Sequence, residues 1–134
     1  NKINWLLNDQ DVSTEQNQLR RRVKGLFPGG GTALYDATKE AFTYLQEKSD
    51  KSRISAVVVL SDGGDTNSTT KLEDLLQAIE GDNETKTTRV FTIGYGGGAN
   101  MEILDAISDK TQAKSYRGTN ENIKDVFKDI ATFF

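Results

Sequence analysis

The fold of this 134-residue chain is decided by an apolar run, ISAVVVL at residues 54–60, and by the polar run SDGGDTNS at residues 61–68. The apolar run is rich in β-branched residues and nearly continuous, which is typical of a strand covered on both faces in a parallel sheet. In open α/β sheets, ligands bind beyond the carboxyl ends of the strands. The polar run is therefore the first place to look for a functional site.

Helical and strand patterns alternate on either side of this strand. Further strands are expected at residues 89–93 and, as a short edge strand, at residues 113–117. The order of elements predicts an α/β fold with an open, mostly parallel sheet and helices on both faces. Apolar residues at three-and-four spacing predict helices near residues 13–26, 32–45, 70–80, 100–107 and 123–134, with Ser13, Thr32, Thr70 and Asn100 at their N-caps.

Composition narrows the possible functions of what we expect to be a single domain over residues 1–134. The chain has no Cys and no His, which removes Ser-His-Asp and Cys-His catalysis, haem ligation and structural zinc. Its net charge is -3 and its basic residues are spread thinly outside residues 20–24, which argues against a nucleic-acid partner. The longest apolar run, residues 56–60, is far short of the about 20 residues that a membrane span needs.

The polar run at residues 61–68 offers the donor atoms that a hard cation prefers. It contains two carboxylates, Asp62 and Asp65, with an amide and several hydroxyls. Such oxygens suit Mg²⁺, Mn²⁺ or Ca²⁺. Gly63 would let the backbone turn sharply beside Asp62 and approach a ligand. An Asx-turn that only caps the loop is the alternative.

A glycine-rich turn at residues 28–32 is a second candidate site. It leads into a predicted helix, so its exposed amides and the helix dipole could hold an anion. A nucleotide site is poorly supported, because no predicted strand immediately precedes the glycines and no P-loop lysine follows them. The turn at residues 94–98 is equally ambiguous.

Taken together, these segments resemble the von Willebrand factor A family. GGTALYDA at residues 30–37, VVVLSDGGDTNS at 57–68 and IGYG at 93–96 agree with the family in order, spacing and placement at strand ends. The resemblance covers nearly the whole chain and implies a three-layer, Rossmann-like open sheet. It also implies a metal-ion-dependent adhesion site at the carboxyl edge of the sheet. By that resemblance the metal ligands are Thr32 and Asp62, and the loops of the site contain Gly30, Gly31, Gly63 and Asp65, with Asp65 at the rim.

The resemblance implies binding without turnover. A Mg²⁺ or Mn²⁺ ion, or Ca²⁺, would keep one position open for a carboxylate from a partner protein. We expect a binding or adhesion module, and not an enzyme, within a larger, extracytoplasmic protein on a bacterial surface or secreted. Two alternatives stay open. One is a Mg²⁺-dependent phosphoryl-transfer or hydrolase domain using Asp62 and Asp65, and the other is a metal-free structural interaction domain.

The sequence departs from the family at its N-terminus. The family's Asp-x-Ser-x-Ser motif, at the end of its first strand, does not occur in these residues. Ile3, Trp5 and Leu7 resemble a remnant of the family's antiparallel edge strand, so we expect an N-terminally truncated domain that lacks the first strand-helix-strand. The metal site would then be incomplete. An open sheet edge would invite pairing, so we expect either a domain-swapped homo-oligomer or a rearranged N-terminal segment.

Overall fold

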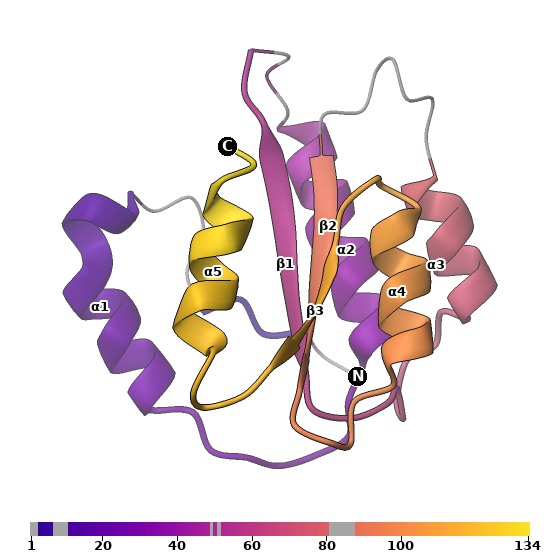
Figure 1. Ribbon diagram of the computed structural model, residues 1–134, viewed down its shortest axis with the longest axis horizontal. Helices are drawn as coiled ribbons and strands as arrows, with labels where there is room; N and C mark the ends of the chain where they lie inside the picture. The colour runs from indigo at the N-terminus through magenta and orange to yellow at the C-terminus, as the bar shows by residue number, and fades with distance from the viewer. Residues whose placement is uncertain (1–2, 7–10, 49, 51, 81–87) are drawn as a thin grey trace.

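The computed structural model describes residues 3–6, 11–48, 50, 52–80 and 88–134. Within these residues, helices and strands follow one another in the predicted order (Figure 1). The expected α/β fold is therefore confirmed. The elements are α1 (Val12–Lys24), α2 (Leu34–Glu47), β1 (Ser55–Ser61), α3 (Leu72–Ile79), β2 (Thr88–Tyr95), α4 (Met101–Asp109), β3 (Ser115–Gly118) and α5 (Ile123–Ala131).

The described strands form one parallel sheet in the order β1-β2-β3. β1 pairs with β2 from Ser55 opposite Thr88 to Ser61 opposite Gly94. Parallel neighbours need long crossover connections, and the chain makes them through α3 and α4. The carboxyl ends of the strands therefore meet at one edge of the sheet, and the loops that follow them lie there.

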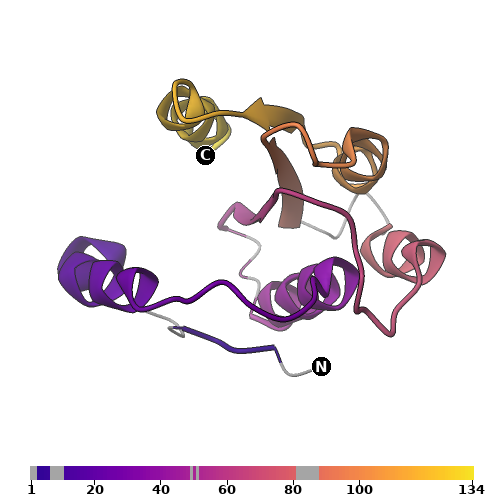
Figure 2. The same cartoon turned by 90° about the horizontal axis from the view of Figure 1, so that it is seen from below.

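Helices cover both faces of the sheet, as Figure 2 shows. One face carries α2, α3 and α4, and the other carries α5. β2 runs through the centre, and its apolar side chains are completely buried. The three-layer arrangement follows from these two cores. The first core contains Phe42, Val57, Leu75, Ile79, Val90 and Ile107, and the second contains Phe91, Ile93, Val126 and Ile130.

Two helices begin at a polar side chain that caps them. The Asp11 carboxylate accepts a hydrogen bond from the Ser13 N–H at 2.8 Å and caps α1. The Asn100 side chain accepts one from the Ile103 N–H at 3.3 Å, which confirms the cap predicted for α4. The cap predicted at Ser13 is wrong, because Asp11 already places an acceptor at the start of that helix.

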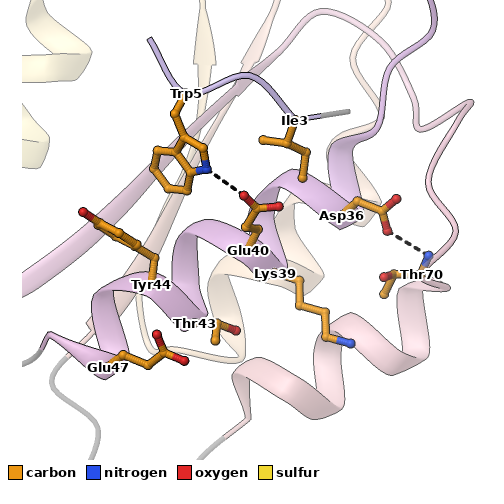
Figure 3. Close-up of a pocket in the computed structure, with 9 residues that line it drawn as sticks. All are labelled: Ile3, Trp5, Asp36, Lys39, Glu40, Thr43, Tyr44, Glu47 and Thr70. Atoms are coloured by element: carbon orange, nitrogen blue, oxygen red, sulfur yellow. Dashed lines mark hydrogen bonds between the residues drawn. The ribbon is translucent and has the colours of Figure 1, made fainter. Parts of the chain in front are cut away.

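The N-terminal segment lies against α2 and not in the sheet (Figure 3). The Trp5 ring centroid is 4.9 Å from that of Tyr44, and the Trp5 Nε1 donates to the Glu40 carboxylate at 2.7 Å. Ile3 and Trp5 have no strand conformation, so the prediction of a remnant edge strand is wrong for them. The aromatic contact and the hydrogen bond hold the segment on the helix. Leu7 lies outside the described residues.

The helix α1 stands apart from both cores. It has no buried residue, and it is separated from the sheet in both views (Figures 1 and 2). Its local chemistry is still favourable, with Asp11 at the N-terminus and Arg21, Arg22 and Lys24 in the last turn, where cations interact well with the helix dipole. Its apolar stripe is left facing solvent.

Candidate functional site

Two loops are joined at the carboxyl end of β1. The carbonyl of Thr32 accepts hydrogen bonds from the N–H groups of Thr66 at 2.9 Å and Asn67 at 3.0 Å. In return, the Thr32 N–H donates to the Thr66 hydroxyl at 2.8 Å. A Cβ on Gly31 would lie 1.8 Å from the Asn67 Oδ1, so a larger residue there would displace the Asn67 side chain. The loop before α2 and the loop after β1 thus form one surface.

The first turn of α2 is capped by the second of these loops. The Tyr35 N–H donates to the Asp65 carboxylate at 3.3 Å, and the Asp36 N–H donates to the Ser68 hydroxyl at 3.0 Å. The Ser68 hydroxyl in turn donates to the Asp65 carboxylate at 2.6 Å, and the Ser68 N–H donates to the same carboxylate at 3.2 Å. Helix N-termini leave N–H groups that need such acceptors. Asp65 therefore has a structural role in addition to any role at the rim of a metal site.

The helix caps predicted at Thr32 and Thr70 are both wrong. The N-cap residues of α2 and α3 are Ala33 and Lys71, and neither makes a cap hydrogen bond through its own side chain. Thr32 and Thr70 each lie one residue too early to cap these helices. The acceptors for α2 come instead from residues that are 30 and 32 positions away in the sequence.

Asp36 makes the reciprocal contact from α2 to the loop that enters α3. Its carboxylate accepts hydrogen bonds from the N–H groups of Thr69 and Thr70, both at 2.9 Å, and from the Thr69 hydroxyl. Figure 3 shows the hydrogen bond from Thr70. These hydrogen bonds, first of all that from the Thr69 backbone, lower the pKa of Asp36 to about 2. Asp36 was not among the site residues predicted from the sequence, although an acidic residue in the first turn of a helix was a signal for it.

A third loop reaches the same edge from β2. A Cβ on Gly98 would lie 2.8 Å from the backbone carbonyl of Asp62, so the turn after β2 is in close contact with the residue after β1. The Ser61 hydroxyl donates to the Gly63 carbonyl at 3.0 Å and holds the turn that exposes Asp62. The Asp62 side chain is exposed and accepts no hydrogen bond from any residue that the structure describes.

The predicted site residues lie on these loops. Thr32 and Ser61 line the same groove, and Asp62 directly follows Ser61. Gly30 has a φ of +79°, a conformation that glycine adopts readily and that other residues rarely adopt. The predicted loops therefore do gather at one edge of the sheet. Thr66, Asn67 and Ser68 belong to the predicted polar run and Gly98 to the turn at residues 94–98, but the sequence did not indicate their contacts with the other loops. Asp36 was not predicted as a site residue.

The side-chain oxygens at this edge of the sheet are of the kind that a divalent cation binds. A threonine hydroxyl and a carboxylate are the oxygen ligands that Mg²⁺ and Mn²⁺ prefer. Within the described ranges, however, no three His, Cys, Asp or Glu side chains gather where they could hold a metal ion. Asp65 is already engaged in capping α2. Thr32 and Asp62 fit the cation in kind, but they fill only part of its coordination shell.

The profile of the von Willebrand factor type A domain matches residues 2–129. The chain belongs to the von Willebrand factor A family. Two of the solved structures that are similar to this chain share its von Willebrand factor A fold. Their sequence identity to it is low, so the similarity supports the fold and not a function. The conserved hypothetical protein BatB from Bacteroides thetaiotaomicron matches with a TM-score of 0.62 and 15% identity, over 89% of this chain and 69% of that one.

The second structure is an uncharacterized membrane spanning protein from Vibrio fischeri. It matches with a TM-score of 0.52 and 13% identity, over 89% of this chain and 66% of that one. No protein of curated function matches the sequence of this von Willebrand factor A domain. Among the helices that the structure describes, none combines the length and hydropathy needed to cross a membrane.

The two aspartates of the loop after β1 should differ in their effect on stability. Asp65→Ala removes the acceptor for the α2 N-terminus and should lower the free energy of unfolding by about 1 kcal/mol, as loss of a helix cap does. Asp62→Ala, measured in chelator, is the matched control and should change it by less than about 0.5 kcal/mol. Urea unfolding monitored by circular dichroism measures both. Equal losses would contradict the assignment of Asp65 as the cap.

The low pKa of Asp36 predicts a specific pH dependence. Since its pKa is depressed on folding, the stability it contributes is present above its ordinary value of 3.8 and is lost as the pH falls toward about 2. Asp36→Ala should therefore be less stable than the wild type at pH 6, and the difference should disappear between about pH 4 and pH 2. Urea unfolding at a series of pH values measures this.

The control for this experiment is Asp109→Ala, at an exposed position in the last turn of α4. Its difference from the wild type should be small across the same pH range. A stability gap for Asp36→Ala that stays constant down to pH 2 would show that the carboxylate of Asp36 is not what holds the loop.

Proposed function

We propose that this domain binds a partner protein through the carboxyl edge of its sheet. Membership of the von Willebrand factor A family supports a protein-interaction module in general. The observation that carries the location is the joining of loops from before α2, after β1 and after β2 at that edge. A surface held by backbone hydrogen bonds is rigid, and rigid surfaces lose little entropy when they bind.

The proposed contact includes a divalent cation. Thr32 and Asp62 would hold Mg²⁺ or Mn²⁺, or Ca²⁺, and the cation would attract a carboxylate that the partner offers. Gly30, Gly31 and Gly63 allow the loops to lie close together, and Asp65 adds negative charge beside them. Because two side chains fill only part of the shell, we expect weak binding of the cation by this chain alone, with a dissociation constant on the order of 1 mM.

Binding of a partner protein in this way requires no catalytic residue. We place the module in an extracytoplasmic protein of a bacterial surface or in a secreted one. The similar fold of a protein described as membrane spanning, from Vibrio fischeri, supports that setting. If no cation binds, the domain would instead be a metal-free interaction domain.

The test uses Mn²⁺, whose paramagnetism detects weak binding. Millimolar Mn²⁺ should selectively broaden the amide NMR signals of Thr32, Asp62 and Gly63, because these residues surround the proposed ion. Asp62→Asn should abolish the effect by removing the carboxylate charge, and Asp109→Asn, an equal loss of charge on α4, should leave it unchanged. Absence of selective broadening at these residues would reject the cation and favour metal-free binding.

A further inference from the structure

Asp62 is followed by a glycine, which sets it apart from the other aspartates of the chain. Asp-Gly occurs once in the sequence, at residues 62–63, and Asn-Gly does not occur. In such a pair the backbone nitrogen of the glycine can attack the carboxyl carbon of the aspartate, because no Cβ obstructs the approach. Whether a given pair reacts depends on how the fold holds the carboxylate, the nitrogen and the backbone between them.

The carboxylate of Asp62 is free to meet this nitrogen. It is exposed, and it accepts no hydrogen bond and forms no ion pair with any residue that the structure describes. Asp65, in the same loop, is the opposite case. Its carboxylate accepts hydrogen bonds from the Tyr35 N–H at 3.3 Å and from the Ser68 hydroxyl at 2.6 Å. A carboxylate held by such donors must leave them before its own backbone can attack it.

The nitrogen of Gly63 is held weakly. Its N–H lies 3.5 Å from the Ser61 hydroxyl, at the outer limit of a hydrogen bond. By contrast, the N–H of Thr66, which follows Asp65, donates to the Thr32 carbonyl at 2.9 Å. Loss of the proton from the nitrogen accompanies its attack, so a weakly held N–H reacts more readily. The same loop therefore contains one reactive aspartate and one protected aspartate.

Two consecutive glycines give the backbone the freedom to close a ring. Apart from its chain neighbours, a Cβ on Gly63 or on Gly64 would meet no heavy atom within 4 Å. The anchors of the turn lie outside this pair, at Ser61, which pairs with Gly94 in the sheet, and at Thr66. Motions of such loops are much faster than ring closure, so the turn samples the reactive geometry many times.

We propose that Asp62 is a site of isoaspartate formation. The carboxyl group takes a proton from solvent, and the Gly63 nitrogen forms a bond to the Asp62 Cγ. A C–O bond of the carboxyl group breaks, and the hydroxyl leaves as water with the proton of the nitrogen. The product is a cyclic imide.

Water then opens this imide at either carbonyl carbon. Opening at Cγ restores aspartate. Opening at the original peptide carbon leaves Gly63 joined through Cγ, which is isoaspartate, and the proton returns to solvent. The water released in the first step is replaced in the second, so the product is an isomer and the reaction needs no oxidant or reductant.

Isoaspartate changes the edge of the sheet where the proposed cation lies. The main chain gains a methylene between Ser61 and Gly63, and the free carboxylate is now the former main-chain carbonyl of Asp62. That carbonyl lies against the turn after β2, because a Cβ on Gly98 would be 2.8 Å from its oxygen. The carboxylate thus moves from the open edge toward that turn. The reaction needs no cation, but the resulting loss of a metal ligand rests on the proposed function.

Peptide mapping of the folded chain, aged in chelator at neutral pH, tests the proposal. A synthetic peptide of residues 60–71 is aged in parallel, and sampling ends when half of its Asp62 has reacted. Enzymatic methylation of isoaspartyl groups measures the product, and fragmentation by electron transfer locates it. The folded chain should contain isoaspartate at Asp62 and several-fold less at Asp65. Its absence from Asp62, or equal amounts at both aspartates, would overturn the proposal.

Two alanine variants test the identity of the attacking residue. Gly63→Ala should slow the reaction at least about threefold, because a Cβ restricts the backbone conformations from which the nitrogen attacks. Gly64→Ala is the matched control, since alanine meets equally open space there, and it should change the rate by less than about twofold. Circular dichroism would verify that both variants are folded. Equal slowing in both would overturn the role of Gly63.

Manganese separates failure of this proposal from failure of the cation proposal. Millimolar Mn²⁺ should slow isoaspartate formation, because a carboxylate bound to the cation is not free to react, and the aged protein should lose the selective broadening at Thr32. Equal rates with and without Mn²⁺ would count against the cation and leave the isomerisation standing. Selective broadening in fresh protein, with no isoaspartate after ageing in chelator, would overturn the isomerisation and leave the cation standing.

Discussion

The arrangement of the candidate site depends on reciprocal hydrogen bonds between the first turn of α2 and the segment that leads from β1 into α3. Asp36, in the first turn of α2, accepts from the N–H groups of Thr69 and Thr70 before α3, while Asp65 and Ser68 accept from the first turn of α2. Backbone N–H groups at helix starts need acceptors, and neither helix has a side-chain cap of its own. The exchange satisfies N–H groups in the first turn of α2, ties the residues before α3 to α2, and fixes the loop after β1 between the two helices.

These hydrogen bonds leave one carboxylate at this edge of the sheet without a structural role. With Asp36 and Asp65 engaged in structure, the Asp62 carboxylate is the acidic group at this edge that accepts no hydrogen bond from a described residue. The Thr32 backbone is likewise held on both sides by Thr66 and Asn67. A rigid edge with one such carboxylate suits recognition of a partner.

The fold could be predicted from the sequence because its elements have clear periodicity. The β-branched run of β1 and the apolar stripes of the helices are local patterns, and the order of elements then determines an open parallel sheet. The caps predicted at Ser13, Thr32 and Thr70 are wrong for different reasons: Asp11 caps α1, the distant residues Asp65 and Ser68 accept from the first turn of α2, and α3 begins after Lys71, whose side chain makes no cap hydrogen bond. The placement of Asp62 after β1 followed from the strand-end rule, whereas the partnership of Asp36 with Thr69 exists only in three dimensions.

Native-state amide hydrogen exchange tests the central claim that the two helix entries are one unit. The N–H groups of Tyr35, Asp36, Thr69 and Thr70 should open with a common free energy, and loss of the Asp65 carboxylate in Asp65→Ala should speed exchange at all four. That result would show that capping α2 also holds the entry to α3. Faster exchange at Tyr35 alone, with Thr69 and Thr70 unchanged, would contradict the account.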